Sequence, residues 1–103
     1  MIVRVFRAKI RAGKLGDWQE EAERAAVPWL ESKRGMLGYY LGKPVDGDAG
    51  EACIVSLWQN VDALREAVGE DWTQAVVLEE EAPLVEEVTV HHYEVFGSSE
   101  SAG

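Results

Sequence analysis

The chain has 103 residues, of which 19 are acidic and 10 are basic, so its formal net charge is −9. This length is typical of one domain, and a hydrophobic content of 47% excludes the composition of a disordered protein. The negative charge argues against a nucleic-acid-binding protein, which needs a basic surface for phosphate, and against docking on anionic membranes. We interpret the acidity as a source of solubility.

Three sequence features bear on location and metal binding. Residues 1–7 include two arginines where a signal peptide would be apolar, and no apolar run approaches membrane-spanning length, so we expect a cytoplasmic protein. Cys53 is the only cysteine, which excludes an internal disulfide and any metal site made of several cysteines. Glu79, Glu80 and Glu81 are interpreted as a solvated helix end rather than a metal cluster, because consecutive helix residues point in different directions.

The first part of the chain predicts a strand followed by a helix. Residues 2–10 are rich in β-branched and apolar types and alternate as a strand does, and Gly13 and Gly16 break that pattern. From residue 15 the apolar spacing becomes helical. Pro28 is expected to kink the last turn of this helix, because proline removes a backbone donor. The apolar positions of the helix are Leu15, Trp18, Ala22, Ala25, Ala26 and Trp29.

Glycine, asparagine and proline mark the boundaries of the later elements. Gly35 and Gly38 bracket the entry to a strand, Asn60 is a good helix N-cap, Gly69 ends that helix, and Pro83 ends a further helical piece. In chain order the pattern predicts strands over 37–43 and 51–58, a helix over 61–68, a helical piece over 72–80 and a last strand over 84–96.

These elements follow the order β-α-β-β-α-β, which is the ferredoxin-like arrangement of the α+β class. The two helices should cover one face of the sheet and leave the other bare. We expect the bare face to be buried against a second copy, in a homodimer. Residues 1–96 are predicted to form this single domain, and residues 97–103, which have little apolar surface to bury, are predicted to be a disordered tail.

The last strand carries the two histidines of the chain, on opposite faces because strand side chains alternate. His92 shares its face with Leu84, Val88, Val90 and Phe96, which is expected to be the helix-packed side, while Val85 and His91 lie on the other. A bulge in the strand would exchange the two faces.

His92 has two interpretations. It is a candidate catalytic general base, because the pKa of histidine lies near neutrality. It is equally a core histidine satisfied by a backbone carbonyl or a tyrosine. Because adjacent histidines on a strand face apart, they do not chelate one metal ion, and no metal site is predicted.

Four further residues are candidate ligand-binding groups. Trp58 and Trp72 could form an aromatic wall around a flat ligand, although core packing is the favoured interpretation, as it is for Trp18 and Trp29. Arg4 interrupts the apolar face of the first strand; it could pair with Glu94 or orient an anionic ligand. Tyr39 and Tyr40 lie on opposite faces of their strand, and one of them should point into a cavity. Tyr39 is counted among the candidates.

Residues 1–96 resemble the antibiotic-biosynthesis monooxygenase (ABM) superfamily, in particular a little-characterised bacterial branch. The resemblance rests on Gly35-Met36-Leu37-Gly38-Tyr39, on Ser56-Leu57-Trp58-Gln59-Asn60, on residues 67–72 with 75–77, and on His92-Tyr93-Glu94-Val95. It implies a dimeric α/β barrel with a small-molecule pocket between sheet and helices in each subunit.

The resemblance implies one of two activities. Cofactor-free members oxidise polycyclic phenols or anthrones with molecular oxygen after substrate deprotonation, and His92, Trp58 and Trp72 could serve this chemistry without a cofactor. Haem-degrading members use a histidine, a tryptophan and an asparagine. The matching positions hold Val77 and Ala67, and the first strand has no asparagine, so haem degradation is disfavoured. The alternative from another class is a non-catalytic small-molecule-binding or structural dimer.

Overall fold

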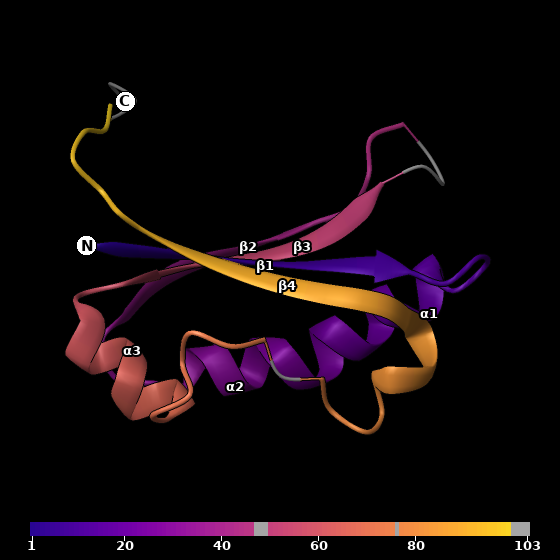
Figure 1. Cartoon of the computed structure of the whole chain (residues 1–103), viewed down its shortest axis with the longest axis horizontal. Coiled ribbons are helices and arrows are strands. Elements are labelled where there is room, and N and C mark those ends of the chain that lie inside the picture. The colour runs from indigo at the N-terminus through magenta and orange to yellow at the C-terminus, as the bar shows by residue number, and fades with distance from the viewer. Residues whose placement is uncertain (47–49, 76, 100–103) are drawn as a thin grey trace.

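The computed structural model describes residues 1–46, 50–75 and 77–99, which form a four-stranded antiparallel sheet with helices on one face (Figure 1). The strand order is β2-β3-β1-β4, which confirms the predicted ferredoxin-like α+β fold. The strands are β1 (Ile2–Ile10), β2 (Met36–Gly42), β3 (Glu51–Trp58) and β4 (Val85–Glu94). The part of the connection 44–50 at residues 47–49, and the part of the predicted tail at 100–103, lie outside the described residues.

The strand register places a row of polar side chains across the sheet. Arg4 in β1 lies opposite Ser56 in β3 on one side and opposite His92 in β4 on the other. Tyr39 in β2 lies opposite Ser56. Because paired residues of neighbouring strands point to the same face, this row of four side chains lies under the helices, among apolar neighbours.

The first helix is continuous but not uniform. It consists of α1 (Leu15–Glu21), a π-helical segment η1 (Ala22–Ala26) and α2 (Val27–Glu31). Pro28 was expected to disturb the last turn, and the irregularity instead lies just before it, in η1. Proline has no N–H for the bond to the residue four positions earlier, which is a reason for the turn ahead of it to widen.

The predicted helix over residues 72–80 is wrong. The second helix is α3 (Val61–Val68), capped by Asn60 and ended by Gly69, where φ is 109°. The described residues that follow, 69–75 and 77–81, form turns and irregular structure, then a short 3-10 helix, η2 (Ala82–Leu84). The carbonyl oxygen of Trp72 accepts a hydrogen bond from the Arg4 side chain, and this long-range contact ties the start of the segment to β1.

A bulge at the start of β4 moves Val85 to the helix-packed face. Lys9 pairs with Glu87, but Ile10 pairs with Val85, so one extra residue is inserted in β4. Val85 is therefore buried, contrary to the predicted alternation. His92 lies beyond the bulge and keeps the face predicted for it, under the helices, whereas His91 is exposed.

The core consists of two clusters on the helix-covered face of the sheet. Trp18 belongs to the first and Trp58 to the second, and Ile54 in β3 packs against both. The buried members are Ala8, Trp18, Ala22, Ala52 and Val85 in one cluster and Ile2, Leu30, Trp58 and Leu64 in the other. Among the described residues, no helix has the length and apolar character needed to cross a membrane.

Candidate functional site

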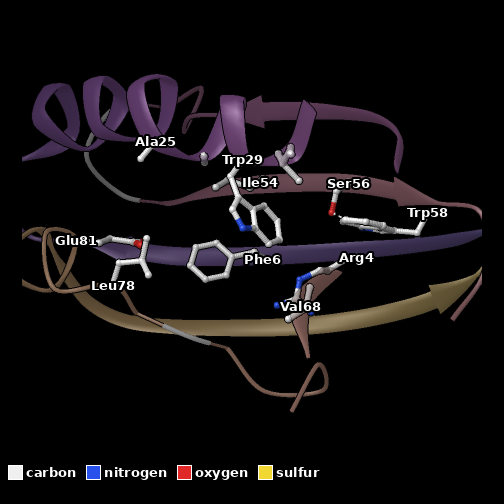
Figure 2. Close-up of a pocket in the computed structure, with 12 residues that line it drawn as sticks. Arg4, Phe6, Ala25, Trp29, Ile54, Ser56, Trp58, Val68, Leu78 and Glu81 are labelled. Carbon is white, nitrogen blue, oxygen red and sulfur yellow. Dashed lines mark hydrogen bonds between the residues drawn. The ribbon is translucent and has the colours of Figure 1, made fainter. Parts of the chain in front are cut away.

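A cavity of about 330 Å³ lies between the sheet and the first helix, at the junction of the two core clusters (Figure 2). Its size falls in the range typical of sites for small organic ligands. The lining is mainly apolar, with Arg4, Ser56 and Glu81 as its polar members. The lining residues are Arg4, Phe6, Ala25, Ala26, Trp29, Leu30, Ile54, Ser56, Trp58, Val68, Leu78 and Glu81.

The helical side of the cavity is formed around the π-helical segment η1. Ala25 and Ala26 belong to this segment, and their small side chains leave space above the sheet. Single π-helical turns are frequent at functional sites. Trp29 follows in α2 and projects over the cavity; it is 41% exposed, which corrects its predicted place in the core. Trp18 is buried at 3% exposure, as predicted.

Arg4 is held in place by the last strand and by the segment after α3. Its Nη1 donates to the carbonyl oxygen of Trp72 at 2.7 Å and to Nε2 of His92 at 2.8 Å. Burial lowers the pKa of Arg4, but a guanidinium stays charged. The predicted Arg4–Glu94 pair is wrong, because the register places Glu94 opposite Ile2.

His92 lies behind Arg4 rather than in the cavity wall. Because a guanidinium only donates hydrogen bonds, Nε2 of His92 acts as the acceptor, and its ring is neutral in this arrangement. Burial, and then the charges of Arg4 and His91, lower the pKa of His92. The ring also meets Trp72 edge-on, with centroids 4.9 Å apart. Its catalytic role stays a prediction.

The other sequence candidates divide between the cavity wall and its surroundings. Trp58 is fully buried in the wall, and its Nε1 donates to Oγ of Ser56 at 2.9 Å. Trp72 packs on His92 and the second core cluster, outside the lining. Tyr39 lies on the helix-packed face, but its hydroxyl donates to Oε1 of Glu31 at 2.9 Å, also outside the lining.

Glu81 is a polar lining residue that sequence reasoning missed. It was interpreted as part of a solvated helix end, whereas it is half-buried at one end of the cavity (Figure 2). Trp18 Nε1 donates to its Oε1 at 3.4 Å. Burial raises the pKa of Glu81 most, the Trp18 bond opposes that effect, and the charge of Glu21 raises it further. Glu81 follows two other glutamates in the sequence. Because a helix was wrongly predicted over residues 72–80, all three glutamates were interpreted as a solvated helix end.

Comparison with known proteins identifies the family of the chain. The family profile described as antibiotic biosynthesis monooxygenase matches residues 1–77. The chain belongs to this family. Membership confirms the resemblance drawn from the strand-entry glycines and the Trp58 junction. No curated protein sequence matches the chain significantly.

Several solved structures have a similar fold, and three of them come from proteins with a named family or activity. A putative antibiotic biosynthesis monooxygenase from Deinococcus radiodurans has a TM-score of 0.74 at 17% identity, covering 100% of both chains. SnoaB, a cofactor-independent oxygenase from Streptomyces nogalater, has a TM-score of 0.73 at 15% identity, covering 94% of both chains. The heme-degrader MhuD from Mycobacterium tuberculosis, with two hemes bound in its active site, has a TM-score of 0.73 at 19% identity, covering 97% of this chain and 100% of its own.

The lining of this family member does not fit a haem held by histidine. His91 is exposed and His92 points its Nε2 at Arg4, so neither imidazole lines the cavity. The residues that the sequence resemblance set against the histidine and tryptophan of haem-degrading members, Val77 and Ala67, have side chains without ligand atoms. Within residues 1–46, 50–75 and 77–99, no group of three or more His, Cys, Asp and Glu side chains is placed to hold a metal ion.

Proposed function

We propose that this protein is a cofactor-independent monooxygenase that acts on a small, flat aromatic or polyketide-like molecule in the cavity between sheet and helices. The observation that carries the proposal is the mainly apolar cavity of about 330 Å³, walled by Trp29, Phe6 and Trp58, with the charged Arg4 in its lining. Family membership supports oxygenase or haem-binding activity in general, and the lining favours the former.

The chemistry requires an electron-rich anion of the substrate in a site that excludes bulk water. An apolar lining raises the strength of each electrostatic contact, and a fixed guanidinium stabilises negative charge on a substrate oxygen. Arg4 meets this requirement, since Trp72 and His92 fix one side of its guanidinium before any ligand arrives. Molecular oxygen then adds to the anionic carbon of an anthrone-type substrate, whose first C–H bond was broken by the deprotonation, and the product is a hydroperoxide. Loss of water breaks the O–O bond and the second C–H bond, so that one oxygen atom stays in the product as a carbonyl and the other leaves as water.

His92 and Trp72 have supporting roles in this proposal. By accepting from Nη1, they orient the Arg4 guanidinium toward the cavity. His92 as the general base remains the competing assignment from sequence. The two assignments differ in their consequences: a positioning residue tolerates a substitution that keeps the acceptor, such as His92→Gln, whereas a base does not.

The test is oxygen consumption by the purified protein with a panel of anthrones and hydroxyquinones. We expect turnover with incorporation of label from ¹⁸O₂, and loss of turnover in Ala25→Phe, which fills the cavity from η1. Glu23→Phe adds the same ring on the exposed side of η1 and should leave turnover intact. Turnover that survives Ala25→Phe would show that the reaction takes place elsewhere.

A non-catalytic binding protein is the second candidate function. It is favoured because three of the candidate site residues already have hydrogen-bond partners within the protein. The Trp58 indole bonds to Ser56, the Tyr39 hydroxyl bonds to Glu31, and His92 bonds to Arg4. This candidate predicts saturable binding of the same aromatic panel without oxygen consumption. Haem binding would instead give a Soret band that saturates stoichiometrically on haemin titration.

We also propose that the open face of the sheet is covered by a second copy of the chain. By strand alternation, Val5, Val55 and Tyr93 lie on this face, and Tyr93 is 54% exposed. Val5→Glu should give a monomer in analytical ultracentrifugation. Val45→Glu, at a fully exposed turn residue away from the sheet, should leave the dimer intact. A wild-type monomer would overturn this assembly.

A further inference from the structure

The two ends of the cavity carry groups of opposite charge. Arg4 lies toward one end and Glu81 at the other, with Phe6 between them (Figure 2). Within the described residues no ion pair joins the two, and the side-chain hydrogen bonds of Arg4 both leave from Nη1. Its remaining N–H donors are therefore available to a ligand, as a guanidinium has five.

The Glu81 carboxylate is positioned by its own turn and by the first helix. The backbone N–H groups of Glu81 and Ala82 both donate to the carbonyl oxygen of Leu78, at 3.0 Å, and the Leu84 N–H donates to the Glu81 carbonyl at 2.8 Å. Trp18, buried in the core, donates its indole N–H to Oε1. The backbone N–H of Leu78 also interacts with this carboxylate. Because a carboxylate has about four acceptor sites, it can still accept a hydrogen bond from a molecule in the cavity.

We propose that Glu81 is the proton-accepting group of this site and that the ligand is a flat conjugated molecule bound at two points, with an acidic hydroxyl at Glu81 and a carbonyl or anionic oxygen at Arg4. In the proton transfer, the ligand O–H bond breaks, a new O–H bond forms on the carboxylate, and the electron pair stays on the ligand oxygen. Conjugation carries that negative charge toward the carbonyl at the Arg4 end. The inference rests on the cavity being the ligand site proposed above.

Position favours Glu81 over His92 for this role. Glu81 lines the cavity, whereas His92 lies outside the lining with Nε2 already accepting from Arg4. The charged group that acts on the Glu81 carboxylate is Glu21 on α1, whose own carboxylate is paired with Arg24, whereas Arg4 lies toward the other end of the cavity. A carboxyl whose pKa is raised by burial is also a stronger proton acceptor than an ordinary surface glutamate.

The test uses two probes that differ in one group, 2-hydroxyanthraquinone and 2-methylanthraquinone, with affinity measured by quenching of tryptophan fluorescence. Glu81→Gln keeps an oxygen for Trp18 but removes the charge. We expect it to weaken binding of the hydroxyl probe about tenfold, as loss of a hydrogen bond to a charged group does, and to leave the methyl probe within about twofold. Arg4→Met should weaken both probes, because both carry the carbonyls.

The matched control is Glu79→Gln, which removes an exposed carboxylate two residues away and should change neither affinity. In the wild type, affinity for the hydroxyl probe should also fall on acidification while affinity for the methyl probe does not, and Glu81→Gln should abolish that difference. If the wild type binds both probes but Glu81→Gln weakens them equally or not at all, the assignment of Glu81 is overturned and the cavity remains a ligand site. If the wild type binds neither probe, the proposed ligand site itself fails.

Discussion

Arg4 Nη1 lies 2.8 Å from Nε2 of His92, directly across the β1–β4 pairing, and this contact couples the protonation of the histidine to the position of the arginine. A protonated imidazole would present an N–H to a donor-only guanidinium and repel it. The arrangement therefore requires a neutral His92. Because His92 helps to position Arg4, it can affect ligand binding in a cavity that it does not line.

Stability should decrease on acidification because of this pair. Burial and the charge of Arg4 lower the pKa of His92, so at mildly acidic pH the folded protein binds fewer protons at this site than the unfolded chain. The favourable contribution is complete above the ordinary histidine pKa of about 6.5 and is lost as the pH falls below it. The measurement is urea unfolding at a series of pH values between about 7.5 and 5.5.

His92→Gln isolates the effect, since glutamine keeps an acceptor for Arg4 but does not titrate. The free energy of unfolding of this variant should depend less steeply on pH than that of the wild type. His91→Gln removes the exposed histidine next to it and should behave much like the wild type. Equal pH slopes for the wild type and His92→Gln would contradict the coupling.

The Trp58 wall should be stabilised by its bond to Ser56. Both residues are buried, so Ser56→Ala leaves the indole N–H without that partner and should cost about 1–3 kcal/mol. A double-mutant cycle with Trp58→Phe, measured by urea unfolding at one protein concentration, should give a coupling of about 1 kcal/mol. Strict additivity of the two substitutions would mean that the hydrogen bond contributes nothing.

The fold could be predicted from sequence wherever a local pattern determined the outcome. The bounds of β1, β3 and α3 follow from alternation, from an apolar run and from the Asn60 cap, and the structure confirms them. The predicted helix over 72–80 is wrong, and the segment is instead tied to β1 by a long-range contact, the Arg4 side chain on the Trp72 carbonyl. A helical period in the sequence carries no information about such a contact.

The cavity was harder to predict than the fold. Its place between sheet and helices was expected, and Trp58 and Arg4 were named, but Glu81 and Trp29 were assigned to a solvated end and to the core. The position of Glu81 in the cavity wall depends on where an irregular segment returns to the sheet. The direction in which the Trp29 side chain projects depends on how the π-helical segment η1 rotates the residues after it. Both are consequences of tertiary packing.

The Asn60 cap should stabilise α3 without contributing to the ligand site. Its Oδ1 accepts from the Ala63 N–H at 2.8 Å, and Asn60 does not line the cavity. Asn60→Ala should cost about 1 kcal/mol of unfolding free energy, while Asn60→Asp, which keeps the acceptor, should cost little. Affinity for 2-hydroxyanthraquinone should be the same in all three proteins, and a selective loss in Asn60→Ala would instead indicate a ligand contact.

Glycine should be required at position 35 both by the backbone conformation there and by the neighbouring residues. Its φ is 82°, and a Cβ at this position would lie 2.6 Å from Cβ of Ala63 in α3. Its carbonyl also accepts from the Gln59 N–H at 2.8 Å, which fixes the start of β2 beside the entry to α3. Gly35→Ala should therefore destabilise the protein by about 1–3 kcal/mol, from backbone strain and overpacking together.

Gly16→Ala provides the matched control, because Gly16 lies in helix α1 with nothing within 4 Å of an added Cβ. That substitution should be neutral or should stabilise the protein by up to about 1 kcal/mol. Adding Ala63→Gly to Gly35→Ala removes the clash but not the positive φ, so thermal unfolding should show that this pair costs less than the sum of its two single changes. If Gly35→Ala were as well tolerated as Gly16→Ala, the strand-entry glycine would have no structural requirement in this fold.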